Sequence, residues 1–363
     1  MNKKKLRCLA APVCGGGLWR RGMLQSVFSL KDLSAGDART VLAVARFVRH
    51  DLGVELRGER LVVALSGGAD STALLTMFCA LRDSLQLSLS AAHLDHGLRA
   101  ESALEADKAG ELCRRFGVPF FMKRENVGEL ALAWRCGVEE AGRRARYAFL
   151  EECRITQGAR WVLTAHHVGD LAEDVLMRLS RGAGWPGLGG MRAVVDEPGR
   201  HVLRPLLMLE KKTLESMLLR LGLSWQEDAS NESRLWKRNR MRHDVMPLFL
   251  AENPSFYESI RRLWRCARRD ERDWNERAGH LPQERNGGLF LSDEDLRSLG
   301  ASDRMRLMAE ALRRMGGELR ADTLESVEVA WHRRHFPRRF SFGGGVKAEL
   351  SGKGLLFFRA PGR

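Results

Sequence analysis

The segment of this chain most suited to chemistry is the run Ser66-Gly67-Gly68-Ala69-Asp70-Ser71. Its glycines let the backbone come close to a ligand, so that main-chain N–H groups can bond phosphate oxygens. Asp70 alone would repel a phosphate, which indicates a magnesium ion between the two. The run therefore predicts a cradle for the phosphates of ATP, with Asp70 as the metal ligand.

The residues on both sides of this run predict that it opens a helix. Residues 61–65 are all apolar, as in a buried strand, and residues 72–81 carry apolar side chains at helical spacing. The partial positive charge of a helix N-terminus attracts anions. The run lacks the Gly-Lys-Ser/Thr ending of a Walker loop. An ordinary glycine turn capped by Ser66 or Ser71 is the structural alternative.

Polar residues follow the second predicted strand, residues 87–94. We expect His93 and Asp95 to face a nucleotide, because ligands of doubly wound sheets bind beyond the carboxyl ends of the strands. A plain polar strand–loop junction is the alternative. A zinc site is disfavoured, because His93 and His96 beside one aspartate are not a familiar zinc spacing.

Charged residues flank the fourth predicted strand, residues 159–165. Asp170 and Glu173 open the helix after it, where they fit a capping box as well as a binding site. Arg146 lies on the helix before it and could neutralise a transferring phosphate, although a solvated arginine face has the same pattern.

The chain is strongly basic, with a formal net charge of +14 and a pI near 10.0. This balance favours a polyanion such as nucleic acid, although a generally basic proteome has the same composition. Residues 223–243 interleave an aromatic with cations, as in RNA-binding segments or in a solvated basic helix. The residues predicted there to contact RNA are Trp236, Lys237, Arg238, Asn239 and Arg242.

Strand and helix patterns alternate between residues 37 and 250. Predicted strands occupy residues 61–65, 87–94, 118–123 and 159–165, and predicted helices residues 37–52, 72–81, 102–116, 138–157 and 170–181. Such alternation predicts an α/β fold with a doubly wound parallel sheet. Five glycines and a proline in residues 182–190 predict a loop.

Three segments are predicted: a basic N-terminal extension (1–36), a catalytic domain (37–250) and a smaller, mainly helical C-terminal domain (251–363) whose residues 340–358 alternate like strands. Seven scattered cysteines without a Cys-x-x-Cys pair indicate reduced thiols in a cytoplasm. The sequence contains no run of eighteen or more apolar residues, so we expect no membrane span.

The loop at 66–71 is similar to the pyrophosphatase loop (PP-loop) of enzymes that cleave ATP into AMP and pyrophosphate. Over residues 40–250 the chain resembles the tRNA(Ile)-lysidine synthetases. The matching blocks are residues 66–71, 93–99, 140–147, 164–173, 204–207, 228–231 and 238–243. The resemblance implies an adenine nucleotide alpha hydrolase-like sheet domain and, more weakly, a tRNA-binding C-terminal domain.

The resemblance also implies a reaction. Such a ligase joins free L-lysine to C2 of the wobble cytidine of isoleucine tRNA with a CAU anticodon, using ATP and Mg²⁺. The cytosine O2 would attack the α-phosphate of ATP and release pyrophosphate, and the lysine ε-amino group would then attack C2 and expel AMP. Adenylation is needed because an oxygen on C2 is a poor leaving group.

Carried over by position, the resemblance assigns roles to residues of this chain. The ATP-binding residues would be Ser66, Gly67, Gly68, Ala69, Asp70, Ser71, His93 and Asp95. Asp70 and Arg146 would be catalytic, Asp170 and Glu173 would bind the lysine amino group, and Arg204 would join the tRNA-binding residues.

Two stretches depart from the family pattern. After Asp170 the family usually has Gln-Ala-Glu-Thr, whereas this chain has Leu171-Ala172-Glu173-Asp174 and so lacks an amide and a hydroxyl. Before Asp170, Val168-Gly169 replaces a polar pair, which predicts an altered helix entry.

Two other functions compete with this interpretation. A tRNA 2-thiolation enzyme would use the same adenylation but usually needs paired cysteines, which are absent. A catalytically decayed basic RNA-binding protein is disfavoured by the intact loop at 66–71. The sequence does not give the oligomeric state, and a homodimer stays open.

Overall fold

The computed structural model describes residues 28–97, 102–226, 237–318 and 321–359. The chain divides into two compact units, Met1–Arg265 and Cys266–Arg363. The division falls within helix α10 (Phe256–Ala278), beyond the domain boundary predicted after residue 250. The first unit contains the predicted chemistry.

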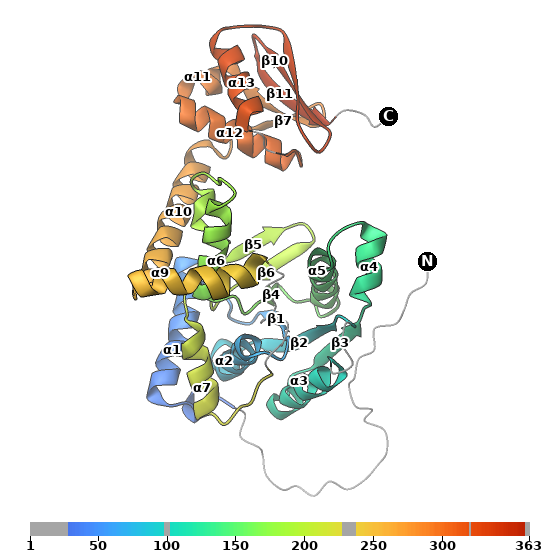
Figure 1. Ribbon diagram of the computed structural model, residues 1–363, viewed down its shortest axis with the longest axis vertical. Coiled ribbons are helices and arrows are strands. Elements are labelled where there is room, and N and C mark those ends of the chain that lie inside the picture. The colour runs from blue at the N-terminus through green and yellow to red at the C-terminus, as the bar shows by residue number, and fades with distance from the viewer. Residues whose placement is uncertain (1–27, 98–101, 227–236, 319–320, 360–363) are drawn as a thin grey trace, which may run out of the picture. The chain divides into compact units, whose positions relative to one another are not determined.

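A six-stranded sheet of order β3-β2-β1-β4-β6-β5 lies at the centre of the first unit (Figure 1). Its strands are β1 (Arg60–Ala64), β2 (Ser88–Asp95), β3 (Phe120–Arg124), β4 (Trp161–Leu163), β5 (Val194–Glu197) and β6 (Arg200–Leu203). Neighbours pair in parallel, except that β5 runs antiparallel to β6. The predicted parallel sheet is confirmed, and the β5–β6 hairpin adds two strands that were not predicted.

Helices cover both faces of this sheet. They are α1 (Ala35–Arg46), α2 (Ala69–Leu85), α3 (Ser102–Phe116), α4 (Val127–Trp134), α5 (Val138–Thr156), α6 (Val168–Leu179) and α7 (Lys211–Arg220). Side chains of a strand alternate between faces. Leu61 and Val63 of β1 therefore join the core under α1, α2 and α7, whereas Val62 packs with Phe149 and Leu150 of α5.

Short helices complete the first unit near the start of α6. They are α8 (Lys237–Arg240), a π-helical turn (Met241–Val245), α9 (Met246–Glu252) and the first part of α10. Met246, Ile260 and Trp264 pack with buried residues of α6 in a separate core. The predicted loop at 182–190 is irregular except for a 3₁₀ turn at Gly187–Gly189.

The second unit combines helices with a five-stranded antiparallel sheet of order β7-β8-β11-β10-β9. Its elements are β7 (Gln283–Arg285), β8 (Gly288–Ser292), α11 (Asp293–Ser298), α12 (Ala301–Arg314), α13 (Ala321–His332), β9 (Arg338–Ser341), β10 (Val346–Ser351) and β11 (Gly354–Arg359). The alternation at residues 340–358 predicted its last strands correctly, whereas β7 and β8 were not predicted. Among the described residues of both units, no helix combines the length and the apolarity that crossing a bilayer requires.

One ion pair connects α1 to α7. Asp37 on α1 accepts hydrogen bonds from Arg220 on α7, at 3.0 Å from Nε and 2.5 Å from Nη2. The Asp37 side chain is 4% exposed, and Ser34 also donates to it. The hydrogen bond from Arg220 holds the pKa of Asp37 below its usual value. Asp37 therefore stabilises the fold in its ionised form.

We expect Asp37→Asn to lower the free energy of unfolding by about 1–2 kcal/mol at neutral pH, because a charge-assisted pair to a half-exposed arginine is lost. Since the folded-state pKa is depressed, the difference from wild type shrinks as the pH falls below about 4. Urea titrations at several pH values measure it. A difference that stays constant down to pH values near 3 would contradict the electrostatic origin.

Candidate functional site

The loop between β1 and α2 is shaped as an anion cradle. It turns at Gly67, whose φ is 91°. Ser71 Oγ accepts from the Ser66 backbone N–H at 3.1 Å and donates to the Gly68 carbonyl at 3.1 Å. Gly68 is the N-cap of α2, and no side chain caps that helix. The serines therefore brace the loop and leave the first N–H groups of α2 available to a ligand.

Asp70, in the first turn of α2, has an unsatisfied carboxylate oxygen. Its Oδ1 is buried and has no hydrogen-bond partner among the described residues. Its Oδ2 lies 3.8 Å from His167 Nε2. Burial raises the pKa of Asp70, and the charge of His167 counteracts this only in part. A buried carboxylate oxygen without a donor fits the binding of a cation.

His167 connects this loop to the start of α6. Its Nε2 lies 3.6 Å from Asp170 Oδ2, and its Nδ1 accepts from the Gly169 backbone N–H at 3.0 Å. Asp170 in turn accepts from the His167 backbone N–H at 2.9 Å. The capping box is thus formed by His167 and Asp170. The predicted box of Asp170 and Glu173 is wrong, because α6 begins at Val168 and Asp170 is already its third residue.

Asp170 and Glu173 meet two arginines from the segment after residue 236. Arg238 donates to Glu173 Oε2 at 2.7 Å and to Asp170 Oδ1 at 2.9 Å. Arg242 donates to Glu173 Oε1 at 2.6 Å and to Asp170 Oδ1 at 3.3 Å. We call these four residues the arginine–carboxylate cluster. The charges of His167 and Arg238 hold the pKa of Asp170 far below its usual value, although burial alone would raise it.

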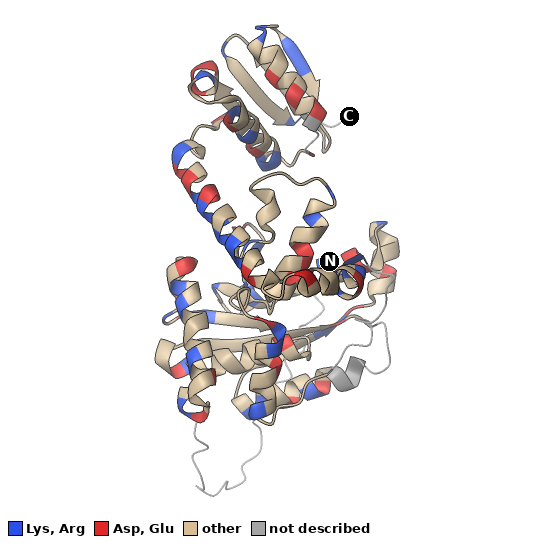
Figure 2. Cartoon of the chain, turned by 60° about the vertical axis from the view of Figure 1, so that its left-hand side comes forward, with Lys and Arg blue, Asp and Glu red and all other residues tan. Residues whose placement is uncertain are grey.

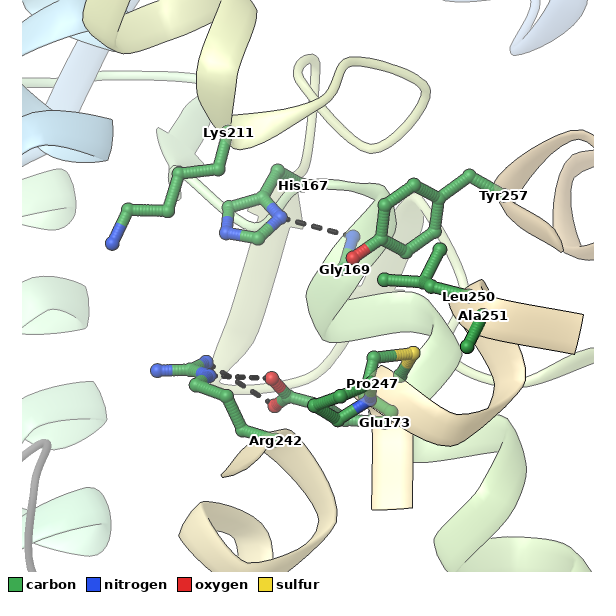
Figure 3. A pocket seen from close by; sticks show the side chains of 10 residues that line it. His167, Gly169, Glu173, Lys211, Arg242, Pro247, Leu250, Ala251 and Tyr257 are labelled. Atoms are coloured by element: carbon green, nitrogen blue, oxygen red, sulfur yellow. Dashed lines mark hydrogen bonds and ion pairs between the residues drawn. The ribbon is translucent and has the colours of Figure 1, made fainter. Parts of the chain in front are cut away.

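A pocket of about 540 Å³ opens beside this cluster (Figure 3). Its polar lining comes from His167, Gly169, Glu173, Lys211, Arg242 and Tyr257, and its apolar lining from Met246, Pro247, Leu250 and Ala251. In Figure 3 the Glu173 carboxylate and the Lys211 side chain border the same space from different elements. A pocket with an acid, a base and an apolar wall suits an amphipathic ligand that carries both charges.

Sequence reasoning missed several lining residues of this pocket, among them Lys211, Tyr257 and the α9 residues. The rarity of tyrosine could have drawn attention to Tyr257, because the chain has only two tyrosines. Both, Tyr147 and Tyr257, lie close to the predicted site residues.

The remaining predicted ATP-binding residues lie near the end of β2, and the predicted catalytic residue Arg146 lies in the middle of α5. His93 is buried, with Nδ1 2.9 Å from the Leu65 carbonyl. Asp95 accepts from the Gly97 backbone N–H at 2.9 Å. Arg146 is exposed, and its Nη2 lies 3.0 Å from His96 Nε2. All three belong to the edge of the sheet that carries the loop after β1.

The residues predicted to contact tRNA do not share one environment. Trp236 lies outside the described residues, as does the block at 228–231. Lys237 is exposed and Asn239 is buried. Arg204 is only 3% exposed, and its Nη1 donates to the Arg192 carbonyl at 2.6 Å. Arg238 and Arg242 bind the carboxylates that were predicted to bind lysine.

Comparison with known proteins assigns this geometry to a class. The family model described as a PP-loop domain matches residues 41–249. The U34-tRNA thiolase NcsA of Methanococcus maripaludis, solved with its 4Fe-4S cluster, has a TM-score of 0.52 at 18% identity and covers 62% of this chain and 77% of its own. That likeness shows the fold alone. The chain belongs to the PP-loop family.

Sequence relatives narrow the class further. The tRNA(Ile)-lysidine synthase of Nitratidesulfovibrio vulgaris is 46% identical over 330 residues, which cover 85% of this chain and 94% of that protein. The one of Geobacter sulfurreducens is 37% identical, over 83% of this chain but 64% of its own length. Within the PP-loop class, this chain belongs to the tRNA(Ile)-lysidine synthases. This membership does not favour the alternative of a tRNA 2-thiolation enzyme.

The arginine–carboxylate cluster should hold the segment 237–245 in place. We expect Glu173→Gln to weaken its charge-assisted bonds to Arg238 and Arg242, and to speed amide hydrogen exchange in that segment by about tenfold. Hydrogen-exchange mass spectrometry measures this. Asp174→Asn is the matched control, since Asp174 on the same helix pairs only with Arg178, at 2.8 Å, among the ion pairs of the described residues. Equal exchange in both variants would show that the cluster does not anchor the segment.

Proposed function

We propose that this protein ligates L-lysine to C2 of the wobble cytidine of tRNA(Ile) with a CAU anticodon, with ATP as the activating substrate. One observation carries the proposal beyond family membership. His167 lies within 4 Å of Asp70 in the phosphate loop and of Asp170 in the carboxylate pair, at 3.8 Å and 3.6 Å. A loop suited to ATP and a pair of acids suited to an ammonium group therefore adjoin at one site.

The phosphate loop supports the ATP half of the proposal. The uncapped start of α2 offers backbone donors to phosphate oxygens, where the helix dipole also favours negative charge. Asp70, with its unsatisfied Oδ1, is the residue that would hold Mg²⁺. When bound, the ion neutralises charge on the phosphates that leave as pyrophosphate.

The first half-reaction forms a bond between cytosine O2 and the α-phosphorus of ATP and breaks the bond to pyrophosphate. Negative charge on the phosphoryl oxygens rises during this step, and cationic donors fixed beforehand stabilise it. Arg146, exposed at the same sheet edge, would face the reacting phosphate. The target base has to leave its stack to reach this edge, as in other base-modifying enzymes.

The second half-reaction forms the bond between the lysine ε-nitrogen and C2, expels AMP and releases a proton. We assign Asp170 and Glu173 to recognition of the lysine amino group. Met246 and Leu250 on the apolar wall would pack against the lysine methylenes, and Lys211 would attract the carboxylate. In the structure both acids are engaged by Arg238 and Arg242.

Lysine therefore has to exchange with a guanidinium at these carboxylates. We infer that tRNA favours this exchange, because its phosphates offer Arg238 and Arg242 an alternative partner. Charge supports RNA contact elsewhere too: arginines recur along α10 in Figure 2, and Lys237 is exposed. Residues 251–363 are proposed as the tRNA-binding domain. A cytoplasmic location fits the free thiols of the described cysteines.

The central test is incorporation of labelled lysine into tRNA(Ile) by the purified protein with ATP. Asp70→Asn should reduce incorporation at least a hundredfold, because the metal-holding charge at the phosphates is lost, whereas tRNA affinity stays within about twofold. Incorporation and filter binding are measured on the same preparations. Loss of both activities together would contradict this division of roles, and pyrophosphate release without incorporation would show that lysine is not the nucleophile.

Free lysine should bind weakly until RNA is present. Arg242→Gln removes one competing cation from Glu173, so we expect lysine to bind this variant about tenfold more tightly than wild type without RNA. Titration calorimetry measures the affinity. Arg178→Gln is the control, because Arg178 pairs with Asp174 on the same helix and does not line the pocket. Weaker binding to Arg242→Gln would mean that Arg242 itself contacts lysine.

A further inference from the structure

Guanidinium groups surround Tyr147 on α5. The guanidinium carbons of Arg143 and Arg200 lie 5.1 Å and 4.8 Å from the centre of its ring. The charges of Arg200 and Arg204 also act on its hydroxyl. We call these four residues the tyrosine–arginine cluster. Its three cations come from different elements: Arg143 from α5, Arg200 from the start of β6, and Arg204 from the position after β6.

In the described part of the chain, no acid forms an ion pair with these three cations. Among the described residues, none of the ion pairs involves Arg143, Arg200 or Arg204. Arg204 is 3% exposed, and the Nε atoms of Arg200 and Arg204 are buried without a hydrogen-bond partner in the described part of the chain. Buried charges are normally paired, because desolvation and like-charge repulsion are costly.

The surroundings of the cluster show this excess of positive charge. Burial opposes ionisation of Tyr147, yet the charges of Arg204, Arg143 and Arg200 outweigh it and lower the pKa of Tyr147. Burial lowers the pKa of Arg204, and the neighbouring arginines lower it further. The arginine–carboxylate cluster is the contrast, since there two arginines meet two carboxylates.

The cluster lies at the catalytic edge of the sheet. Arg204 directly follows β6, and the Thr164 backbone N–H after β4 donates to the Leu203 carbonyl at 3.0 Å. His166, next to His167, feels the charges of Arg204 and Arg143, which add to burial in lowering its pKa to about 3. Arg143 is exposed and Arg200 half-buried, so a ligand from solvent can reach them.

We propose that the tyrosine–arginine cluster is an oxyanion site that binds a phosphate group. Guanidinium forks match phosphate oxygens in geometry, and one phosphate would supply the negative charge that the described residues lack. Two sources share this chemistry: a backbone phosphate of the RNA beside the target nucleotide, and the pyrophosphate end of ATP. The choice between these sources rests on the function proposed above, whereas the charge imbalance does not.

Arg200→Gln is the test variant, because it removes one cation without removing the Arg204 bond to the Arg192 carbonyl. Arg160→Gln is the matched control. Arg160 also stacks on an aromatic ring, 5.2 Å from the centre of Trp161, but it has a carboxylate partner, Asp196, at 3.3 Å. Pyrophosphate binding is measured by thermal shift and calorimetry. Binding of a CAU anticodon stem–loop RNA is measured at several salt concentrations, and neither assay contains lysine.

If RNA supplies the phosphate, Arg200→Gln weakens stem–loop binding by about tenfold and reduces the salt slope by about one, with pyrophosphate binding unchanged. If ATP supplies it, pyrophosphate binding weakens by about tenfold and RNA binding does not change. Either result supports the site, and lysine incorporation can fail or succeed independently. Affinities for both ligands within twofold of the Arg160→Gln control would overturn it.

Discussion

Compensation of buried charge at one sheet edge is the constraint on which the site depends. Asp70 has a buried carboxylate oxygen without a donor, and the tyrosine–arginine cluster has the buried Arg204 beside two more accessible arginines, without an acid among the described residues. Between them, the arginine–carboxylate cluster is balanced. An unpaired buried charge is costly until a partner arrives. The two imbalances have opposite sign, so a cation and a phosphate would relieve both, while the balanced cluster can only exchange partners.

The sequence predicted the elements that depend on local pattern. The apolar run before the glycines is β1, and its alternate side chains enter two cores because helices cover both faces. The six polar or small residues 66–71 then predicted the turn at Gly67 and the start of α2, since strand, turn and helix signals agreed. The β5–β6 hairpin was missed because Val194–Glu197 ends in two acids and each strand has only four residues.

The partners of the carboxylates could not be predicted, because they depend on contacts between distant segments. Arg238 and Arg242 look like an RNA-binding pattern in the sequence, and nothing local connects them to Glu173, which lies 65 and 69 positions earlier. The pocket was missed for the same reason, since α6, α7, α9 and α10 each contribute a wall. Local periodicity indicates which face of a helix is apolar, but not which other helix covers it.

The departures from the family pattern fall at positions where the structure explains them. Leu171 is fully buried in the core around α6, and Asp174 pairs with Arg178, so neither lines the pocket. At position 169 the structure gives a steric reason for glycine. A Cβ there would lie 2.7 Å from His167 Cε1, closer than such atoms come. Only glycine lets the imidazole fold back over the start of α6, and that position brings His167 Nε2 close to both Asp70 and Asp170. Gly169 therefore makes room for His167 between the phosphate loop and the carboxylate pair.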